Sequence, residues 1–143
     1  MAITVGVIGC GGISRFHFPG LEQAGANVKW VCDLNEDAAA PRAAQFGAHY
    51  TSDSDVIMQD DAVDAVFVLT TSGAHKKLCL DAIEAGKAVV CEKTLATNPD
   101  DALVITAAAR AKGLVFFTSY MKRYLPAMEQ ARQLMPQLGR IIT

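Results

Sequence analysis

The amino-acid sequence predicts an α/β fold in which a doubly wound, mainly parallel sheet carries helices on both faces. Short runs rich in valine and isoleucine recur between alanine-rich segments of helical character. Each run is apolar almost throughout instead of alternating with polar residues, so both faces of each strand are expected to be covered. Strands that alternate with helices along a chain are typical of this architecture. A length of 143 residues with 51% hydrophobic residues suits one domain with an ordinary core.

The apolar runs predict five strands, over residues 3–8, 28–32, 65–69, 88–91 and 114–117. The first helix is expected directly after the first strand, and Pro19 falls inside it. Proline lacks a backbone donor and its ring clashes with the preceding turn, so we expect this helix to be kinked or split near Pro19.

Capping signals place two further helices. Asn35 precedes two acidic residues, which predicts a helix over residues 36–46 that ends at Gly47. The pair Asn98–Pro99 predicts the start of a helix over residues 100–112, because proline is tolerated at the first helical position.

A helix over residues 74–85 is predicted from its apolar stripe. Leu78, Ala82 and Ala85 follow one another at helical spacing, and Gly86 is the expected stop.

Composition and charge argue against several classes of partner. The formal net charge is -2, which gives no basic field for nucleic acid or an anionic membrane surface. No apolar run approaches the ~20 residues that span a bilayer, and the first residues lack the pattern of a signal peptide. We therefore expect a soluble, cytoplasmic protein that binds neither nucleic acid nor membrane. The sequence leaves homo-oligomerisation open.

The four cysteines, Cys10, Cys32, Cys79 and Cys91, lie far apart in the sequence. They form no C-x-x-C pair, and no histidine stands at metal-ligand spacing from them. We predict no metal site and expect buried thiols that pack as small hydrophobic groups.

A glycine-rich turn follows the first predicted strand. Gly9 and Gly11 occupy the first two places of the pattern G-x-G-x-x-G, and Ser14 takes the third. The first glycine permits the tight turn, the second lets the backbone approach a pyrophosphate, and a small third residue lets helix and strand pack closely. With Gly12 and Ile13, this segment predicts the phosphate-binding turn of a Rossmann-type dinucleotide-binding domain. The alternative is a purely structural turn.

An acidic residue follows the second predicted strand. Asp33 lies about two dozen residues beyond Gly9, close to the spacing of a carboxylate that binds the adenosine ribose hydroxyls. A 2′-phosphate would meet Asp33 as a like charge, and residues 34–36 supply no arginine for it. NAD is therefore favoured over NADP. The alternative is that Asp33 is a solvated turn residue or a helix cap.

Three segments resemble one family of enzymes. GKAVVCEKT at residues 86–94 is similar to the GKHVLCEKP segment of the glucose–fructose oxidoreductase and inositol dehydrogenase (Gfo/Idh/MocA) family. TTSGAH at residues 70–75 resembles its T-P-x-x-x-H stretch, and RYLP at residues 123–126 resembles its R-x-x-P. Threonine replaces proline at Thr71 and Thr94. Without the proline ring, we expect a trans peptide bond between Lys93 and Thr94.

The resemblance implies hydride transfer between a nicotinamide and a hydroxyl-bearing carbon of a sugar or cyclitol. It makes Lys93 the catalytic residue, because a lysine beside an oxidised nicotinamide has its pKa lowered and transfers a proton readily. The alternative is a solvated lysine, or one paired with Glu92.

The resemblance also implies cofactor contacts, from Thr70, Thr71, His75, Glu92 and Arg123. For His75 the alternative is a histidine that bonds local backbone, and for Arg123 a surface ion pair. His17 and His49 match no motif and are interpreted as structural or surface residues.

The predicted domains are an NAD(P)-binding Rossmann domain at residues 1–121 and a connecting segment at residues 122–143. The connecting segment contains a helix over residues 126–134 and ends like the first strand of the family's second domain. That domain supplies the substrate pocket in the family, so we expect a truncated chain that binds cofactor without efficient turnover.

Two other functions stay open. One is a non-catalytic NAD-binding sensor or regulator, in which the glycines and Asp33 bind and Lys93 is incidental. The other is an S-adenosylmethionine-dependent methyltransferase, against which the Glu92–Lys93 segment argues.

Overall fold

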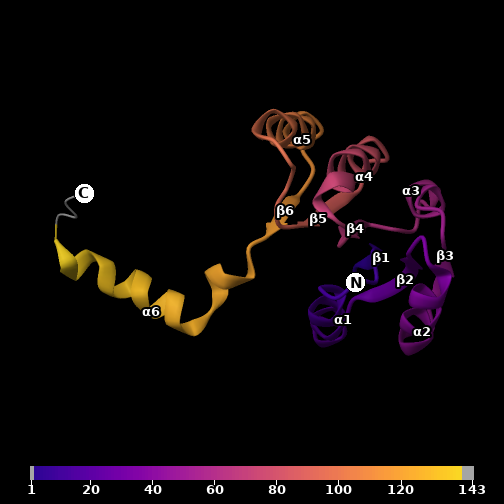
Figure 1. The fold of residues 1–143 in the computed structure, drawn as a ribbon, viewed down its shortest axis with the longest axis horizontal. Coiled ribbons are helices and arrows are strands. Elements are labelled where there is room, and N and C mark those ends of the chain that lie inside the picture. The colour runs from indigo at the N-terminus through magenta and orange to yellow at the C-terminus, as the bar shows by residue number, and fades with distance from the viewer. Residues whose placement is uncertain (1, 140–143) are drawn as a thin grey trace.

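The computed structural model describes residues 2–139 and contains a six-stranded sheet in the order β3-β2-β1-β4-β5-β6. Every pair of neighbouring strands is parallel. The chain winds outward from β1 first to one edge and then to the other, which is the doubly wound topology (Figure 1). The predicted fold class is therefore confirmed.

The strands are β1 (Thr4–Ile8), β2 (Asn27–Cys32), β3 (His49–Thr51), β4 (Ala65–Val68), β5 (Ala88–Glu92) and β6 (Phe116–Ser119). The helices are α1 (Ser14–Gln23), α2 (Glu36–Phe46), α3 (Asp55–Gln59), α4 (Ser72–Glu84), α5 (Pro99–Ala111) and α6 (Pro126–Leu134). Two short 3-10 helices, η1 (Met121–Tyr124) and η2 (Met135–Leu138), flank α6.

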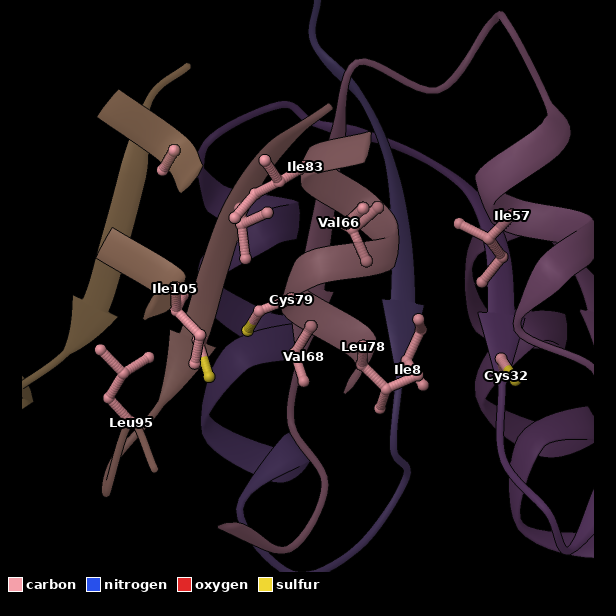
Figure 2. Close-up of a cluster of buried hydrophobic side chains, with 14 of the residues drawn as sticks. Ile8, Cys32, Ile57, Val66, Val68, Leu78, Cys79, Ile83, Leu95 and Ile105 are labelled. Carbon is pink, nitrogen blue, oxygen red and sulfur yellow. The ribbon is translucent and has the colours of Figure 1, made fainter. Parts of the chain in front are cut away.

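Two apolar layers hold the helices against the sheet. On one face, Phe18 and Leu21 of α1 pack with Ala39 and Ala43 of α2 over strand valines such as Val7. On the other face, helices α3, α4 and α5 supply the larger cluster of side chains shown in Figure 2. Burying one such aliphatic side chain contributes ~1.5–3 kcal/mol. Both faces are covered, as the unbroken apolar runs predicted.

The cysteines behave as packing residues. Cys32, Cys79 and Cys91 are buried in the larger cluster, and Cys10 is half-buried beside the glycine turn. All four are free thiols.

The capping predictions are confirmed. The Asn35 side chain accepts a hydrogen bond from the Asp37 backbone N–H, and α2 ends at Gly47 in the left-handed conformation. The Asn98 side chain likewise accepts from the Asp101 backbone N–H at the start of α5.

The observed elements differ from the predicted ones at three places. Helix α1 is not split at Pro19 but continues from Ser14 to Gln23, because the buried side chains of Phe18 and Leu21 anchor it on both sides of the proline. Ala85 is exposed instead of lying on the apolar stripe, because α4 ends at Glu84. Strand β3 was not predicted, since it has only three residues and none of them is buried.

The last described segment stands apart from the layers. Figure 1 shows α6 extending away from the sheet and its helices, and every described residue from 121 to 139 is exposed. The further strand expected at the end of the chain falls on residues 140–143, which lie outside the described residues.

Candidate functional site

Four neighbouring strands end at the same edge of the sheet and bring the predicted site residues there. Gly9 follows β1 and Asp33 follows β2. Thr70 lies just after β4, and Lys93 directly follows β5. Because these strands are adjacent and parallel, their carboxyl ends lie at one edge of the sheet, which is the edge where ligands bind in open α/β sheets. The four strand ends therefore bring Gly9, Asp33, Thr70 and Lys93 to one edge of the sheet.

The backbone of the glycine turn packs closely against the backbone just after β4. Gly9 has φ +103°, and its N–H donates to the Cys32 carbonyl over 2.7 Å. A Cβ at this position would lie 2.8 Å from the carbonyl carbon and oxygen of Leu69, so only glycine fits. Gly11 and Gly12, in contrast, are exposed, and a Cβ on either would meet nothing within 4 Å. The turn thus leaves open space where a pyrophosphate would lie.

The third position of the pattern closes the turn. Ser14 is fully buried, and its hydroxyl donates to the Gly11 carbonyl over 2.7 Å. No side chain caps α1 at its N-cap residue, Ile13. The N–H groups of Ser14 and Phe16 donate to the carbonyls of Gly11 and Ile13. No side-chain cap occupies the start of the helix, which is a position that suits an anion.

The Asp33 carboxylate holds the turn from the side of β2. One oxygen accepts the Cys10 N–H over 2.7 Å, and the other accepts the Asn35 N–H over 3.0 Å. The cap of α2 is Asn35, so Asp33 does not cap the helix. Each carboxylate oxygen keeps a second acceptor site. The geometry therefore fits ribose hydroxyls as additional donors.

The thiol in the glycine turn stays neutral. Burial, with the nearby Asp33 carboxylate in support, raises the pKa of Cys10 to about 11, although Arg42 opposes this shift. The thiol is therefore protonated near neutral pH and places no negative charge beside the phosphate position.

A buried carboxylate lies immediately before Lys93. Glu92 is 2% exposed, and one of its oxygens lies 2.8 Å from Nε2 of His17. The other oxygen accepts the Lys93 N–H over 3.0 Å, while the Lys93 side chain is exposed. Burial alone would raise the pKa of Glu92, but hydrogen bonds from His17, the Lys93 N–H and Ser119 together hold it below its ordinary value of 4.5. Glu92 is thus bound to protein groups, and its assignment as a cofactor contact stays a prediction.

The peptide bond between Lys93 and Thr94 is cis, so the expectation of a trans bond was wrong. That expectation rested on the missing proline ring alone. It took no account of the hydrogen bonds that hold the turn from both sides, at the Lys93 N–H and at the Thr94 carbonyl.

His75 joins two of the strand ends. The ring is fully buried, with Nδ1 2.9 Å from the Thr94 carbonyl oxygen and Nε2 3.1 Å from the Thr70 carbonyl oxygen. These contacts match the alternative of a histidine that bonds backbone, and a cofactor contact by His75 stays a prediction. Thr71, the N-cap of α4, is exposed.

A hollow of about 580 Å³ lies beside the Lys93 turn. Lys93 and Thr94 line it from one side, and Tyr120, Lys122 and Arg123 line it from the segment after β6. Arg123 therefore shares a cavity with Lys93, as a cofactor or substrate contact would.

The described residues contain no candidate for a metal site or for a membrane-spanning helix. Within residues 2–139, no group of three or more His, Cys, Asp or Glu side chains could hold a metal ion. Over the same residues, no helix is both long and apolar enough to cross a membrane.

Sequence reasoning missed two contacts of this site. His17 meets Glu92 across 75 positions, and Asp33 reaches the Cys10 backbone across 23. Neither pair matches a motif spacing, so only the fold brings these groups together. For Asp33 the acid was predicted, but not its role in holding the turn.

A family described as oxidoreductases with an NAD-binding Rossmann fold matches residues 3–120. The matched segment contains the glycine turn, Asp33 and the Lys93 turn.

Three known proteins show how far the similarity extends. Inositol 2-dehydrogenase 3 of Saccharopolyspora erythraea is 40% identical over an alignment of 143 positions, which covers 97% of this chain and 42% of the relative. The WlbA dehydrogenase of Chromobacterium violaceum, solved with NADH and UDP-GlcNAcA, has a TM-score of 0.92 at 28% identity. The matched part covers 98% of this chain and 42% of the WlbA chain. KijD10, a 3-ketoreductase of Actinomadura kijaniata solved with NADP, has a TM-score of 0.89 at 29% identity. The matched part covers 96% of this chain and 43% of KijD10. This chain thus spans less than half the length of each.

Proposed function

Because this chain belongs to the Gfo/Idh/MocA family of oxidoreductases with an NAD-binding Rossmann fold, we propose that it is the cofactor-binding part of an NAD-dependent dehydrogenase. Its substrate class is a sugar or cyclitol that is oxidised at a hydroxyl-bearing carbon. One observation carries the proposal: the glycine turn, Asp33 and Lys93 lie at one edge of the sheet, on adjacent strand ends. The inositol and sugar-nucleotide dehydrogenases among the relatives support the substrate class.

The chain divides by function at residue 121. Residues 1–121 form the cofactor domain, and residues 122–143 form a connecting segment. The exposure of every described residue from 121 to 139 supports this division, because a segment packed into the cofactor domain would be covered.

The cofactor is NAD in preference to NADP. The glycine turn and the start of α1 receive the pyrophosphate, and Asp33 accepts hydrogen bonds from the adenosine ribose. A 2′-phosphate at that ribose would lie beside the Asp33 carboxylate and the acidic start of α2, Glu36 and Asp37. Like charges there disfavour NADP.

Lys93 acts at the substrate hydroxyl. When bound, NAD+ supplies the hydride acceptor. The Lys93 side chain is exposed at the mouth of the hollow that Arg123 also lines, where its Nζ can accept the hydroxyl proton as a general base. Glu92 and His75 hold the turn that carries Lys93.

Titration calorimetry tests the cofactor assignment. NADH is expected to bind to the 143-residue chain at least about tenfold more tightly than NADPH, a difference of ~1.4 kcal/mol. S-adenosylmethionine is the control ligand and should not bind. Equal dissociation constants for NADH and NADPH would contradict the role of Asp33.

A chimera tests the catalytic assignment. Residues 1–120 replace the corresponding part of the S. erythraea inositol 2-dehydrogenase, and myo-inositol-dependent reduction of NAD+ is measured. Lys93→Ala in this chimera should lower kcat by ~10²- to 10⁴-fold, with NADH binding nearly unchanged. The 143-residue chain alone should bind NADH with almost no turnover, since one part of a site cannot hold both reacting carbons at attack distance.

The outcomes distinguish a dehydrogenase with a catalytic Lys93 from a non-catalytic NAD-binding sensor. Wild-type kcat in the Lys93→Ala chimera, with chemistry shown to be rate-limiting, would make Lys93 structural. A chimera that binds NADH but never reduces NAD+ would favour the non-catalytic sensor.

A further inference from the structure

A buried polar pair connects the helix after the glycine turn with the strand that leads to Lys93. His17 lies in the first turns of α1, and Glu92 is the last residue of β5. Their side chains are 11% and 3% exposed and lie 2.8 Å apart. The proposed function gives His17 no role, so its pairing with Glu92 needs a separate explanation.

The Glu92 carboxylate joins helix α1 to the turn after β5. One oxygen lies 2.8 Å from Nε2 of His17, and the other accepts the backbone N–H of Lys93 over 3.0 Å. The direction of the backbone at Lys93 therefore depends on the orientation of this carboxylate. His17 fixes that orientation from the helix whose first residues face the phosphate position.

A second histidine holds the same turn from the other side. His75 contacts the Thr94 carbonyl on one ring nitrogen and the Thr70 carbonyl on the other. The backbone from Glu92 to Thr94 is thus held at both ends by hydrogen bonds, while the exposed Lys93 lines the hollow.

Stability alone does not account for the pair. Buried polar pairs are often no more stabilising than apolar residues of similar size, because both groups lose their hydration. An apolar pair could fill the space next to the Phe67 ring, whose centroid lies 6.2 Å from that of His17. A polar pair at this place orients the neighbouring backbone, because the Glu92 carboxylate accepts the Lys93 N–H in a directional hydrogen bond. Apolar packing has no such directional bond.

We propose that His17 and Glu92 are positioning residues for Lys93, which tie the lysine-bearing turn to helix α1 so that cofactor binding and lysine placement are coupled. The inference rests on the proposed function of Lys93. It assigns to α1 two tasks: its first residues face the phosphates, and its fourth residue sets the position of the proton acceptor.

Two variants that differ by one methylene group test the proposal. In His17→Gln the side-chain amide is long enough to donate to Glu92, whereas in His17→Asn it falls short. Both variants remove the ring and keep a polar side chain. Circular dichroism checks that each is folded, and calorimetry sets the NADH concentration that saturates it.

The readout is the acetylation rate of each lysine in the 143-residue chain, resolved by peptide mass spectrometry with and without saturating NADH. NADH should slow the acetylation of Lys93 about tenfold in the unaltered chain and in His17→Gln, and less than about threefold in His17→Asn. Lys77 on α4 and Lys112, directly after α5, are internal references whose rates should not respond to NADH.

Lys87→Met is the control for lost stability. The buried Lys87 donates to the carbonyls of Asp60 and Val63 over 2.8 and 3.0 Å, before β5 begins and so at the opposite edge of the sheet. Its loss should lower the melting temperature and leave the protection of Lys93 by NADH unchanged.

The outcomes distinguish the two proposals. Full protection of Lys93 in NADH-saturated His17→Asn, or equal loss of protection in Lys87→Met, would overturn the positioning role alone. Failure of the unaltered chain to bind NADH would overturn the proposed function and the positioning role with it. If His17→Asn does not fold, Glu92→Gln and Glu92→Met make the same comparison, because only glutamine can accept the Lys93 N–H.

Discussion

At the scale of single residues, the glycine turn separates what the fold needs from what the cofactor needs. Gly9 has a positive φ and touches the backbone of Leu69, whereas Gly11 faces open space. The same pattern therefore contains one glycine that the fold requires and one that it does not require, and we expect the second to serve the approach of a ligand.

Alanine at each position should show this difference. Gly9→Ala should lower the free energy of unfolding by ~2–4 kcal/mol, because the methyl group meets backbone atoms in a conformation that alanine disfavours. Gly11→Ala should leave the melting temperature unchanged and weaken NADH binding at least about tenfold. Thermal melts and calorimetry on both variants check the prediction. A stability loss in Gly11→Ala would show that the open space is needed for the turn itself.

At the scale of elements, helix α1 carries an internal proline that it tolerates. Pro19 is the sixth residue of α1, so the carbonyl of Arg15 has no backbone donor there. Both residues are exposed, and water can satisfy that carbonyl. The buried Phe18 and Leu21 keep the helix on the sheet.

Pro19→Ala should therefore stabilise the protein. Restoring the donor should raise the free energy of unfolding by ~1–3 kcal/mol. Pro99→Ala is the matched control and should change stability little, because Pro99 occupies the first position of α5, where its missing N–H has no helical partner. Denaturant unfolding of both variants measures the difference. Equal effects would mean that the position of a proline within its helix does not decide its energetic effect here.

Elements differ in how well the sequence predicts them. The bounds of α2 and α6 were predicted as observed, because capping residues and prolines mark their ends. Strand β3 was missed because a three-residue strand at the sheet edge, paired only to β2, carries no apolar run.

At the scale of the whole molecule, carboxylates with lowered pKa values make stability depend on pH. Asp60 accepts hydrogen bonds from Lys29, Trp30 and the Ala62 N–H, which lower its pKa from 3.8 to about 2. Glu92 also titrates below its ordinary value. A carboxyl that loses its proton more readily in the folded chain stabilises the fold above its ordinary pKa, and this contribution is lost as the pH falls toward the folded pKa.

The melting temperature should therefore change little from about pH 7 to pH 5 and fall below about pH 4.5. Asp60→Asn should melt lower than wild type at neutral pH, and the gap should close as the pH approaches about 2. Asp61→Asn, at the exposed neighbouring position, is the control. Circular dichroism melts across this range measure the effect, and a gap between Asp60→Asn and wild type that does not change with pH would contradict it.

The sequence predicted the layout of the site better than its contacts. Gly9, Asp33 and Lys93 follow apolar runs that are recognisable as parallel strands, and parallel strands must bring them to one edge. The pairing of His17 with Glu92 depends on the distance between two elements that are 75 positions apart, and no local pattern encodes it. The cis bond at Lys93–Thr94 was likewise missed, because its threonine gives no signal for it.

The two hydrogen bonds that Asp33 accepts have a consequence for cofactor engineering. Reversing a preference for NAD usually means replacing the acid after the second strand with a small or basic residue. Here the same carboxylate holds the Cys10 N–H of the phosphate-binding turn. Removing it would take away an acceptor that the turn uses before any cofactor arrives. A redesign for NADP must therefore supply a new acceptor for that N–H along with the cation for the 2′-phosphate.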